Sequence, residues 1–112
     1  MKSYTDLEQS KKLAEILPLE SADFMWEYNP DKETYWDKPT MIPIDSYIFV
    51  NDIPCWSLAA LLRELPDTML GKDKDGYVVM VETMGSGLTA FASNPIDACY
   101  EMIIKLHEQK LL

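Results

Sequence analysis

The side chains in this sequence with the strongest nucleophilic or metal-binding chemistry are two cysteines and one histidine. Cys99 and His107 fall in one predicted helix but eight residues apart, about 12 Å along the axis and too far for a thiol–imidazole pair. Cys55 precedes Trp56 near the start of another predicted helix, where the dipole would lower the pKa of its thiol. No base or metal ligand is spaced to use either thiol, so we expect both to be structural and assign no catalytic residue.

A second chemical pattern is a run of aspartates and glycines with calcium-loop spacing. Positions 1, 3, 5, 6 and 12 of an EF-hand loop would be filled by Gly71, Asp73, Asp75, Gly76 and Glu82. The glycine at position 1 supplies no carboxylate, and the residues that follow favour a strand where the motif needs a helix. We therefore predict a polar turn over 71–76, with no metal and no cofactor.

Aromatic and acidic side chains alternate between residues 20 and 40. Clustered aromatics in polar surroundings are typical of protein-binding hot spots, and the candidate binding residues are Tyr28, Glu33, Tyr35, Trp36 and Asp37. Trp36 is the best anchor, because it lies among charges with no apolar periodicity around it. In the alternative, Phe24, Trp26 and Tyr28 form one buried strand face, and Tyr35 and Trp36 pin down the loop.

The first half of the chain predicts one helix and little regular sheet. Thr5 and Glu8 have capping-box spacing, which predicts a helix over 6–17 that ends before Pro18. Alternation predicts a strand within 22–28, followed by a turn at Asn29-Pro-Asp. Residues 46–50 form a short β-prone run. We interpret 20–46 as a long, partly irregular segment carrying one strand.

A strongly apolar stretch follows, and we predict it to be a central helix over 54–65. Its apolar stripe has helical spacing and consists of Leu58, Leu61, Leu62 and Leu65. Asp52 is the expected N-cap, and Pro54 would lie in the first turn. A helix that is apolar nearly all round has to be covered on several sides.

The last third predicts a hairpin and a helix. Residues 77–83 are β-branched and aromatic, and 88–92 run back after a glycine-containing turn, which indicates an antiparallel hairpin. Asn94 and Pro95 occupy the favoured N-cap and N1 positions of a final helix. Its expected buried stripe contains Ile96, Cys99, Ile103 and Leu106.

These elements predict an α+β fold in a single domain spanning 1–112. We expect an antiparallel sheet of three to four strands with three helices packed on it and the apolar helix 54–65 at the centre. Two arrangements stay open: the central helix lies between the sheet and other helices, or helices cover both faces of the sheet.

The composition excludes several kinds of partner. The chain has 112 residues and a formal net charge of −9, which argues against direct nucleic-acid binding and against an anionic membrane surface. The opening residues contain no apolar signal segment, and no apolar run is long enough for a membrane span. Two cysteines make no disulfide framework, so we expect a cytoplasmic protein with reduced thiols.

Three segments resemble small uncharacterised proteins encoded by phages and prophages of gut bacteria. They are Leu7-Glu-Gln-Ser-Lys-Lys-Leu-Ala-Glu-Ile-Leu-Pro, Ile53-Pro-Cys-Trp-Ser-Leu-Ala-Ala-Leu-Leu and Asn94-Pro-Ile-Asp-Ala-Cys-Tyr-Glu-Met-Ile-Ile-Lys-Leu-His. The helix–sheet–helix plan is also similar to phage α-β-α sandwich domains. The resemblance implies an intracellular phage accessory protein, and it brings no activity or site with it.

Two functional hypotheses remain in front. We favour a small protein-binding module that is not an enzyme and acts on a protein partner not yet identified, and a homodimer is left open. The alternative is an acidic inhibitor or DNA mimic that occupies a basic site on a host protein. A mimic would need ordered carboxylates on one face, whereas an ordinary solvated surface would scatter them.

Overall fold

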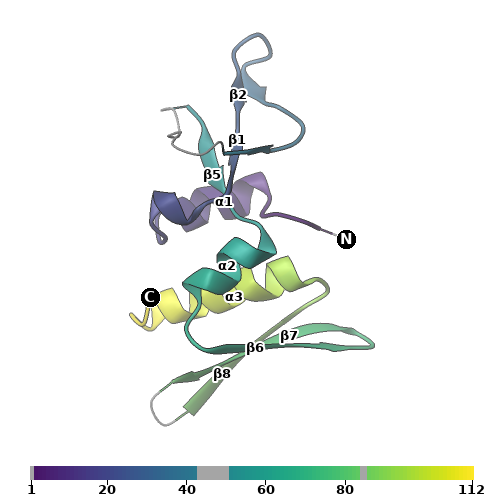
Figure 1. The fold of residues 1–112 in the computed structure, drawn as a ribbon, viewed down its shortest axis with the longest axis vertical. Coiled ribbons are helices and arrows are strands. Elements are labelled where there is room, and N and C mark those ends of the chain that lie inside the picture. Colours follow the sequence, from purple (N-terminus) through teal and green to yellow (C-terminus); the bar gives the residue numbers. More distant parts are fainter. Residues whose placement is uncertain (1, 43–50, 84–85) are drawn as a thin grey trace.

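The fold is α+β, as predicted, with its helices stacked between two small sheets (Figure 1). The computed structural model describes residues 2–42, 51–83 and 86–112, so the β-prone run 46–50 lies outside the described part. The helical elements are α1 (Leu7–Ala14), the short 3-10 helix η1 (Leu19–Ser21), α2 (Leu58–Glu64) and α3 (Pro95–Glu108). The strands are β1 (Phe24–Trp26), β2 (Tyr28–Asn29), β3 (Thr34–Tyr35), β4 (Thr40–Met41), β5 (Ile53–Cys55), β6 (Thr68–Asp73), β7 (Gly76–Thr83) and β8 (Ser86–Ala92).

The described strands form three antiparallel sheets, not the single sheet that we expected. One sheet has the order β6-β7-β8, a second has the order β4-β1-β5, and β2 pairs with β3 alone. The hairpin over 77–83 and 88–92 is confirmed by β7 and β8. The prediction of a polar turn over the whole of 71–76 is wrong, because β6 runs to Asp73 and the turn contains only Lys74 and Asp75. Strand β6 was not predicted from the sequence, because it is an edge strand with largely exposed side chains and therefore lacks a clear apolar alternation.

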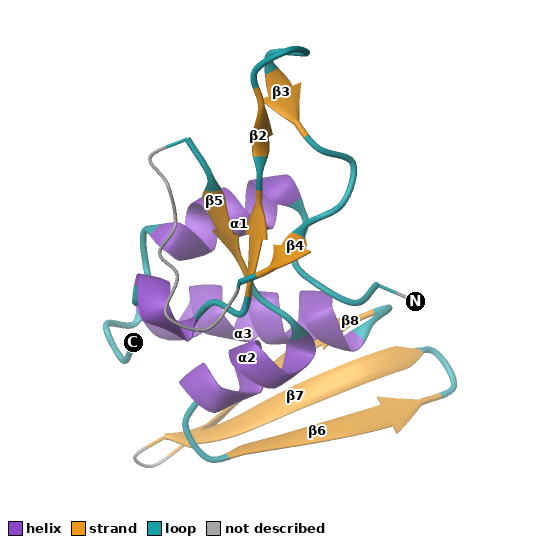
Figure 2. Cartoon of the chain, turned by 45° about the horizontal axis from the view of Figure 1, so that its top comes forward, coloured by secondary structure: helices purple, strands orange, loops and turns teal. Residues whose placement is uncertain are grey.

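The final helix is confirmed, and it is the element packed on both sides. Asn94 accepts a hydrogen bond from the Asp97 amide, and Pro95 lies in the first turn. Helix α3 packs against β7 and β8 on one side and against α2 on the other (Figure 2). Ile96, Cys99 and Ile103 of its predicted stripe are fully buried.

The predicted central helix over 54–65 is wrong at its start and in its position. Residues Ile53–Cys55 form β5, which pairs with β1, and α2 begins only at Leu58. Ser57 is the N-cap, with its Oγ accepting from the Ala60 amide, while the carboxylate of Asp52 accepts from the Tyr28 amide. Pro54 is compatible with a first helical turn, but it is equally compatible with an extended strand, and β1 was available as a partner for this segment. Helix α2 buries only Ala60 and Leu61, so α3 and not α2 is the central helix.

The first helix is also shorter than predicted, and its cap is different. Asp6 closes the capping box with Gln9, in place of Thr5 with Glu8, and the helix ends at Ala14. Thr5 is instead buried: its amide donates to the Trp56 carbonyl at 2.9 Å, and its Oγ1 accepts from the Trp56 amide at 3.1 Å. The pairing of Thr5 with Trp56 therefore replaces the capping role that the local pattern predicted for Thr5.

Trp56 is the largest fully buried side chain of the described core. Its indole Nε1 donates to the Ser21 hydroxyl at 2.9 Å, so the large ring is buried without an unpaired donor. Leu13 of α1, Leu61 of α2 and Met102 of α3 belong to the same core cluster. One continuous core thus joins the helices to the face of the β6-β7-β8 sheet that carries Val79.

The outline of the molecule is elongated, with extents of 50 × 30 × 24 Å. The β2–β3 hairpin projects from the far end of the body, opposite the β6-β7-β8 sheet (Figure 1). Among the described residues, no helix has both the length and the apolar character that a membrane span requires.

Leu61→Asp should unfold the protein, because Leu61 is completely buried and the core of the described residues contains no basic side chain to pair with the new charge. We expect a loss of about 4 kcal/mol or more, measured as loss of a cooperative thermal transition. Ala59→Asp is the matched control, because Ala59 is exposed on the same helix, and it should change stability by about 0.5 kcal/mol or less. A cooperative Leu61→Asp melt close to the parent would contradict this description of the core.

Candidate functional site

The arm, residues 27–38, brings most of the sequence-predicted binding residues together. Tyr28 and Tyr35 are register partners in the β2–β3 pair, and their rings meet edge to face with centroids 5.6 Å apart. The loop that joins the strands begins with the predicted Asn29-Pro-Asp turn, where the Asn29 side chain accepts from the Asp31 amide. Edge-to-face aromatic pairs contribute about 0.5–1.5 kcal/mol beyond the area that they bury. The arm is thus held by its own contacts.

Trp36 follows β3 directly and is 54% exposed. Its amide donates to the Glu27 carbonyl at 3.0 Å, which fixes the backbone while the indole stays in solvent. The alternative in which Tyr35 and Trp36 both pin the loop is correct only for Tyr35, which is half-buried against Tyr28. An exposed tryptophan on an ordered backbone is arranged as an interface anchor would be.

A shallow hollow of about 610 Å³ lies beside this indole. Trp36 and Asp37 line it together with Glu27, Lys38 and Thr40. Lys38 and Thr40 follow Trp36 closely in the sequence, whereas Glu27 becomes its neighbour only because β2 pairs with β3. The hollow combines an apolar ring with charges of both signs, which suits a polar peptide surface.

Glu33 and the aromatic residues of β1 lie away from the Trp36 hollow, although the sequence places them close to Trp36. Glu33 is exposed in the turn at the tip of the arm, with a φ of 53°, and it does not line the hollow. Phe24 and Trp26 both contact the Tyr4 ring, at centroid distances of 6.1 and 6.0 Å. These two therefore share one strand face as predicted, whereas Tyr28 belongs to the arm.

The two thiols are enclosed and protonated at neutral pH. Burial raises the pKa of Cys99 to about 11, and it also raises the pKa of Cys55 despite a hydrogen bond from Thr5. The expectation of a helix dipole acting on Cys55 is wrong, because Cys55 belongs to β5 and its Sγ donates to the Thr5 carbonyl. Both cysteines fill the core as small apolar side chains.

The residues with calcium-loop spacing lie along an extended hairpin. The Oδ1 atom of Asp73 accepts from the amides of Asp75 and Gly76, which stabilises the tight β6–β7 turn. Glu82 lies further along β7, opposite Gly87. Across the described part of the chain, no three side chains of the metal-binding types gather around one point.

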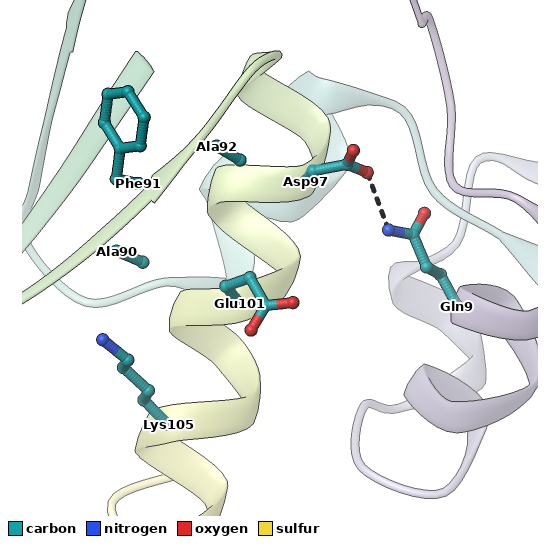
Figure 3. A pocket seen from close by; sticks show the side chains of 7 residues that line it. All are labelled: Gln9, Ala90, Phe91, Ala92, Asp97, Glu101 and Lys105. Carbon is teal, nitrogen blue, oxygen red and sulfur yellow. Dashed lines mark hydrogen bonds between the residues drawn. The ribbon is translucent and has the colours of Figure 1, made fainter. Parts of the chain in front are cut away.

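A second hollow, of about 380 Å³, lies between β8 and α3 (Figure 3). Figure 3 shows Asp97, Glu101 and Lys105 in a row along α3, with the side chains of Ala90 and Ala92 directed towards the helix. We call this hollow the β8 groove; Gln9 and Phe91 complete its lining. Sequence reasoning missed it, although the i, i+4 spacing of the three helix residues places them on one face.

Asp97 holds the end of the β8 groove to α1 and to the N-terminal segment. Its carboxylate accepts from Lys2 Nζ at 2.8 Å, from Gln9 Nε2 at 2.7 Å and from Asn94 Nδ2 at 2.7 Å. Partial burial acts to raise the pKa of Asp97, but the hydrogen bonds from Lys2, Gln9 and Asn94 outweigh it, and the pKa lies below the ordinary 3.8. The ionised form is therefore favoured by folding.

Asp97→Ala should lower stability by about 1 kcal/mol at neutral pH, a modest value because the side chain is 32% exposed and solvent screens its interactions. Since folding lowers this pKa, the contribution is complete above 3.8 and is lost as the pH falls through the lower folded value. Chemical denaturation between pH 7 and pH 2 measures both effects. Glu101→Ala is the matched control one turn along, and the idea fails if its acid sensitivity differs from the parent as much as that of Asp97→Ala.

In comparisons with protein-family models, with curated proteins and with solved structures, none matched this chain.

Proposed function

We propose that this protein is a small protein-binding module, without catalytic activity of its own, that acts through the arm with Trp36 as its anchor. The observation that carries the proposal is the 54% exposure of Trp36 on a backbone fixed by its bond to Glu27. Burying such a ring on a partner gains apolar contact without the cost of first ordering the loop. Tyr35, Tyr28 and Asp37 would support the anchor from the same arm.

The cellular setting is part of the proposal. The three segments quoted above resemble phage and prophage proteins, and they support an accessory role in the cytoplasm of an infected or lysogenic bacterium. Here the partner would be a protein of the host or of the phage. Exposed carboxylates occur on separate elements, among them Glu8 of α1, Glu33 of the arm and Asp75 of the β6–β7 turn. That spread favours the binding module over the acidic mimic.

Trp36→Ala should weaken binding by about 2 kcal/mol, roughly thirtyfold, because it removes the anchor. The melting temperature should stay near that of the parent, since Trp36 is 54% exposed and lies outside the buried core. Parent and variant, used as baits in lysates of a lysogenic gut bacterium, would be compared by quantitative mass spectrometry. The partner that they identify would then be titrated calorimetrically.

Leu19→Ala is the matched control, because Leu19 is another large apolar side chain of similar exposure, 52%, and it lies outside the arm. Equal binding by Trp36→Ala and the parent at equal stability would refute the arm as the interface. The salt dependence of the same complex separates the mechanisms. A flat response supports the aromatic anchor, and a steep loss between low and physiological salt points to carboxylates on a basic site.

A further inference from the structure

The outer edge of β8 presents backbone hydrogen-bonding groups. β8 pairs with β7 on one side, and among the described strands it has no neighbour on the other. The Thr89 carbonyl accepts from Lys105 Nζ at 2.6 Å, so this carbonyl points away from β7. Hydrogen-bonding direction alternates along an antiparallel strand, so the N–H and C=O groups of Gly87 and Phe91 share the direction of Thr89. Three alternate residues of β8 are thus oriented to receive a further strand.

The β8 groove lies directly beside this edge. The small side chains of Ala90 and Ala92 leave space between β8 and α3, and Glu101 of α3 lies along it (Figure 3). Among the described residues, the carboxylate of Glu101 has no ion-pair partner, whereas that of Asp97 is neutralised by Lys2. Phe91 borders the groove, but its ring points away from α3 (Figure 3), and on that opposite face of the sheet Met80 of β7 is also an exposed apolar side chain. The two sides of the edge therefore differ in chemistry.

We propose that an extended segment of another protein, with basic and apolar residues in alternation, adds antiparallel to β8 as a fourth strand of the sheet. Successive side chains of a strand point to opposite faces. The basic residues would enter the β8 groove towards Glu101, and the apolar ones would lie beside Phe91. This surface is separate from the arm, so the inference does not depend on the function proposed above.

A second copy of this chain is a poorer occupant of the same edge. Two copies would each bring a net charge of −9, and pairing β8 with β8 would bring both Glu101 carboxylates to one interface. Like charges close together oppose association. A basic segment has the opposite charge and meets the same carboxylates favourably.

Lys105 occupies one hydrogen-bonding group of the β8 edge, the Thr89 carbonyl, and leaves the others free for an added strand. A lysine beside a strand edge is a common protection against unselective pairing. Its bond to the Thr89 carbonyl is exposed, so solvent readily replaces it. An arriving strand would exchange its own N–H for the ammonium group, and Lys105 would turn out into solvent.

The probe is a synthetic heptapeptide in which lysine and valine alternate, titrated into the full chain at physiological salt. In the proposed antiparallel pairing, the residues opposite Gly87, Thr89 and Phe91 are the valines, so their N–H groups face β8. N-methylation of the valines should reduce affinity about tenfold or more. The same modification of three of the four lysine backbone nitrogens gives a peptide of equal charge and composition, and it should leave affinity unchanged.

Variants of the protein test the same contact from the other side. Thr89→Pro removes an outward N–H without breaking the ladder to β7, which an edge strand tolerates, and it should weaken the peptide about tenfold. Glu101→Gln should weaken it about threefold, whereas Glu108→Gln at the end of the same helix should not. Hydrogen exchange should show new protection at the Thr89 and Phe91 amides on binding.

Three results would overturn the inference. The first is a peptide that does not bind the parent, and the second is equal binding by the peptides methylated on valine and on lysine. The third is a dimer of the free protein that Thr89→Pro dissociates, because this would assign the edge to a second copy.

Discussion

The fold depends on the burial of Trp56 with all of its polar atoms paired. Its amide and carbonyl pair with Thr5, and its ring donates to Ser21. These bonds tie the N-terminal segment and η1 to the junction between β5 and α2. An unpaired indole or amide at full burial would cost about 1–3 kcal/mol each. The ring therefore acts as a structural centre only because residues distant in sequence supply its partners.

Helix α3 connects the core around Trp56 to the β6-β7-β8 sheet. It packs against β7 and β8 with one side and against α2 with the other, so it joins the sheet to the rest of the core. The arm and the β8 edge lie at opposite ends of the molecule (Figure 1). A partner on one need not obstruct a partner on the other. Both surfaces combine a backbone fixed by sheet pairing with exposed side chains, which keeps the ordering cost of binding low.

A candidate residue could be found from the sequence only where the local pattern of apolar residues already indicated whether its side chain is exposed. Trp36 was identifiable because no periodicity accounted for it, and the structure places it in solvent. Glu27 could not be identified, because it becomes a neighbour of Trp36 through pairing between β2 and β3. The β8 groove is still less visible, since Gln9 and Glu101 come from helices far apart in sequence.

The sequence by itself determined the α+β class, the β7–β8 hairpin and helix α3, because their signals are local: β-branched alternation, a turn, and Asn94 followed by Pro95. Tertiary structure decided the conformation of those segments in which long-range pairing opposed the local signal. Ile53–Cys55 forms a strand because it pairs with β1. Thr5 is not the N-cap of α1, because its hydroxyl accepts a hydrogen bond from the buried amide of Trp56. Division into three sheets was decided in the same way. Short segments such as β4 and β5 gain their hydrogen bonds only from strands remote in the chain, and no local propensity encodes that pairing.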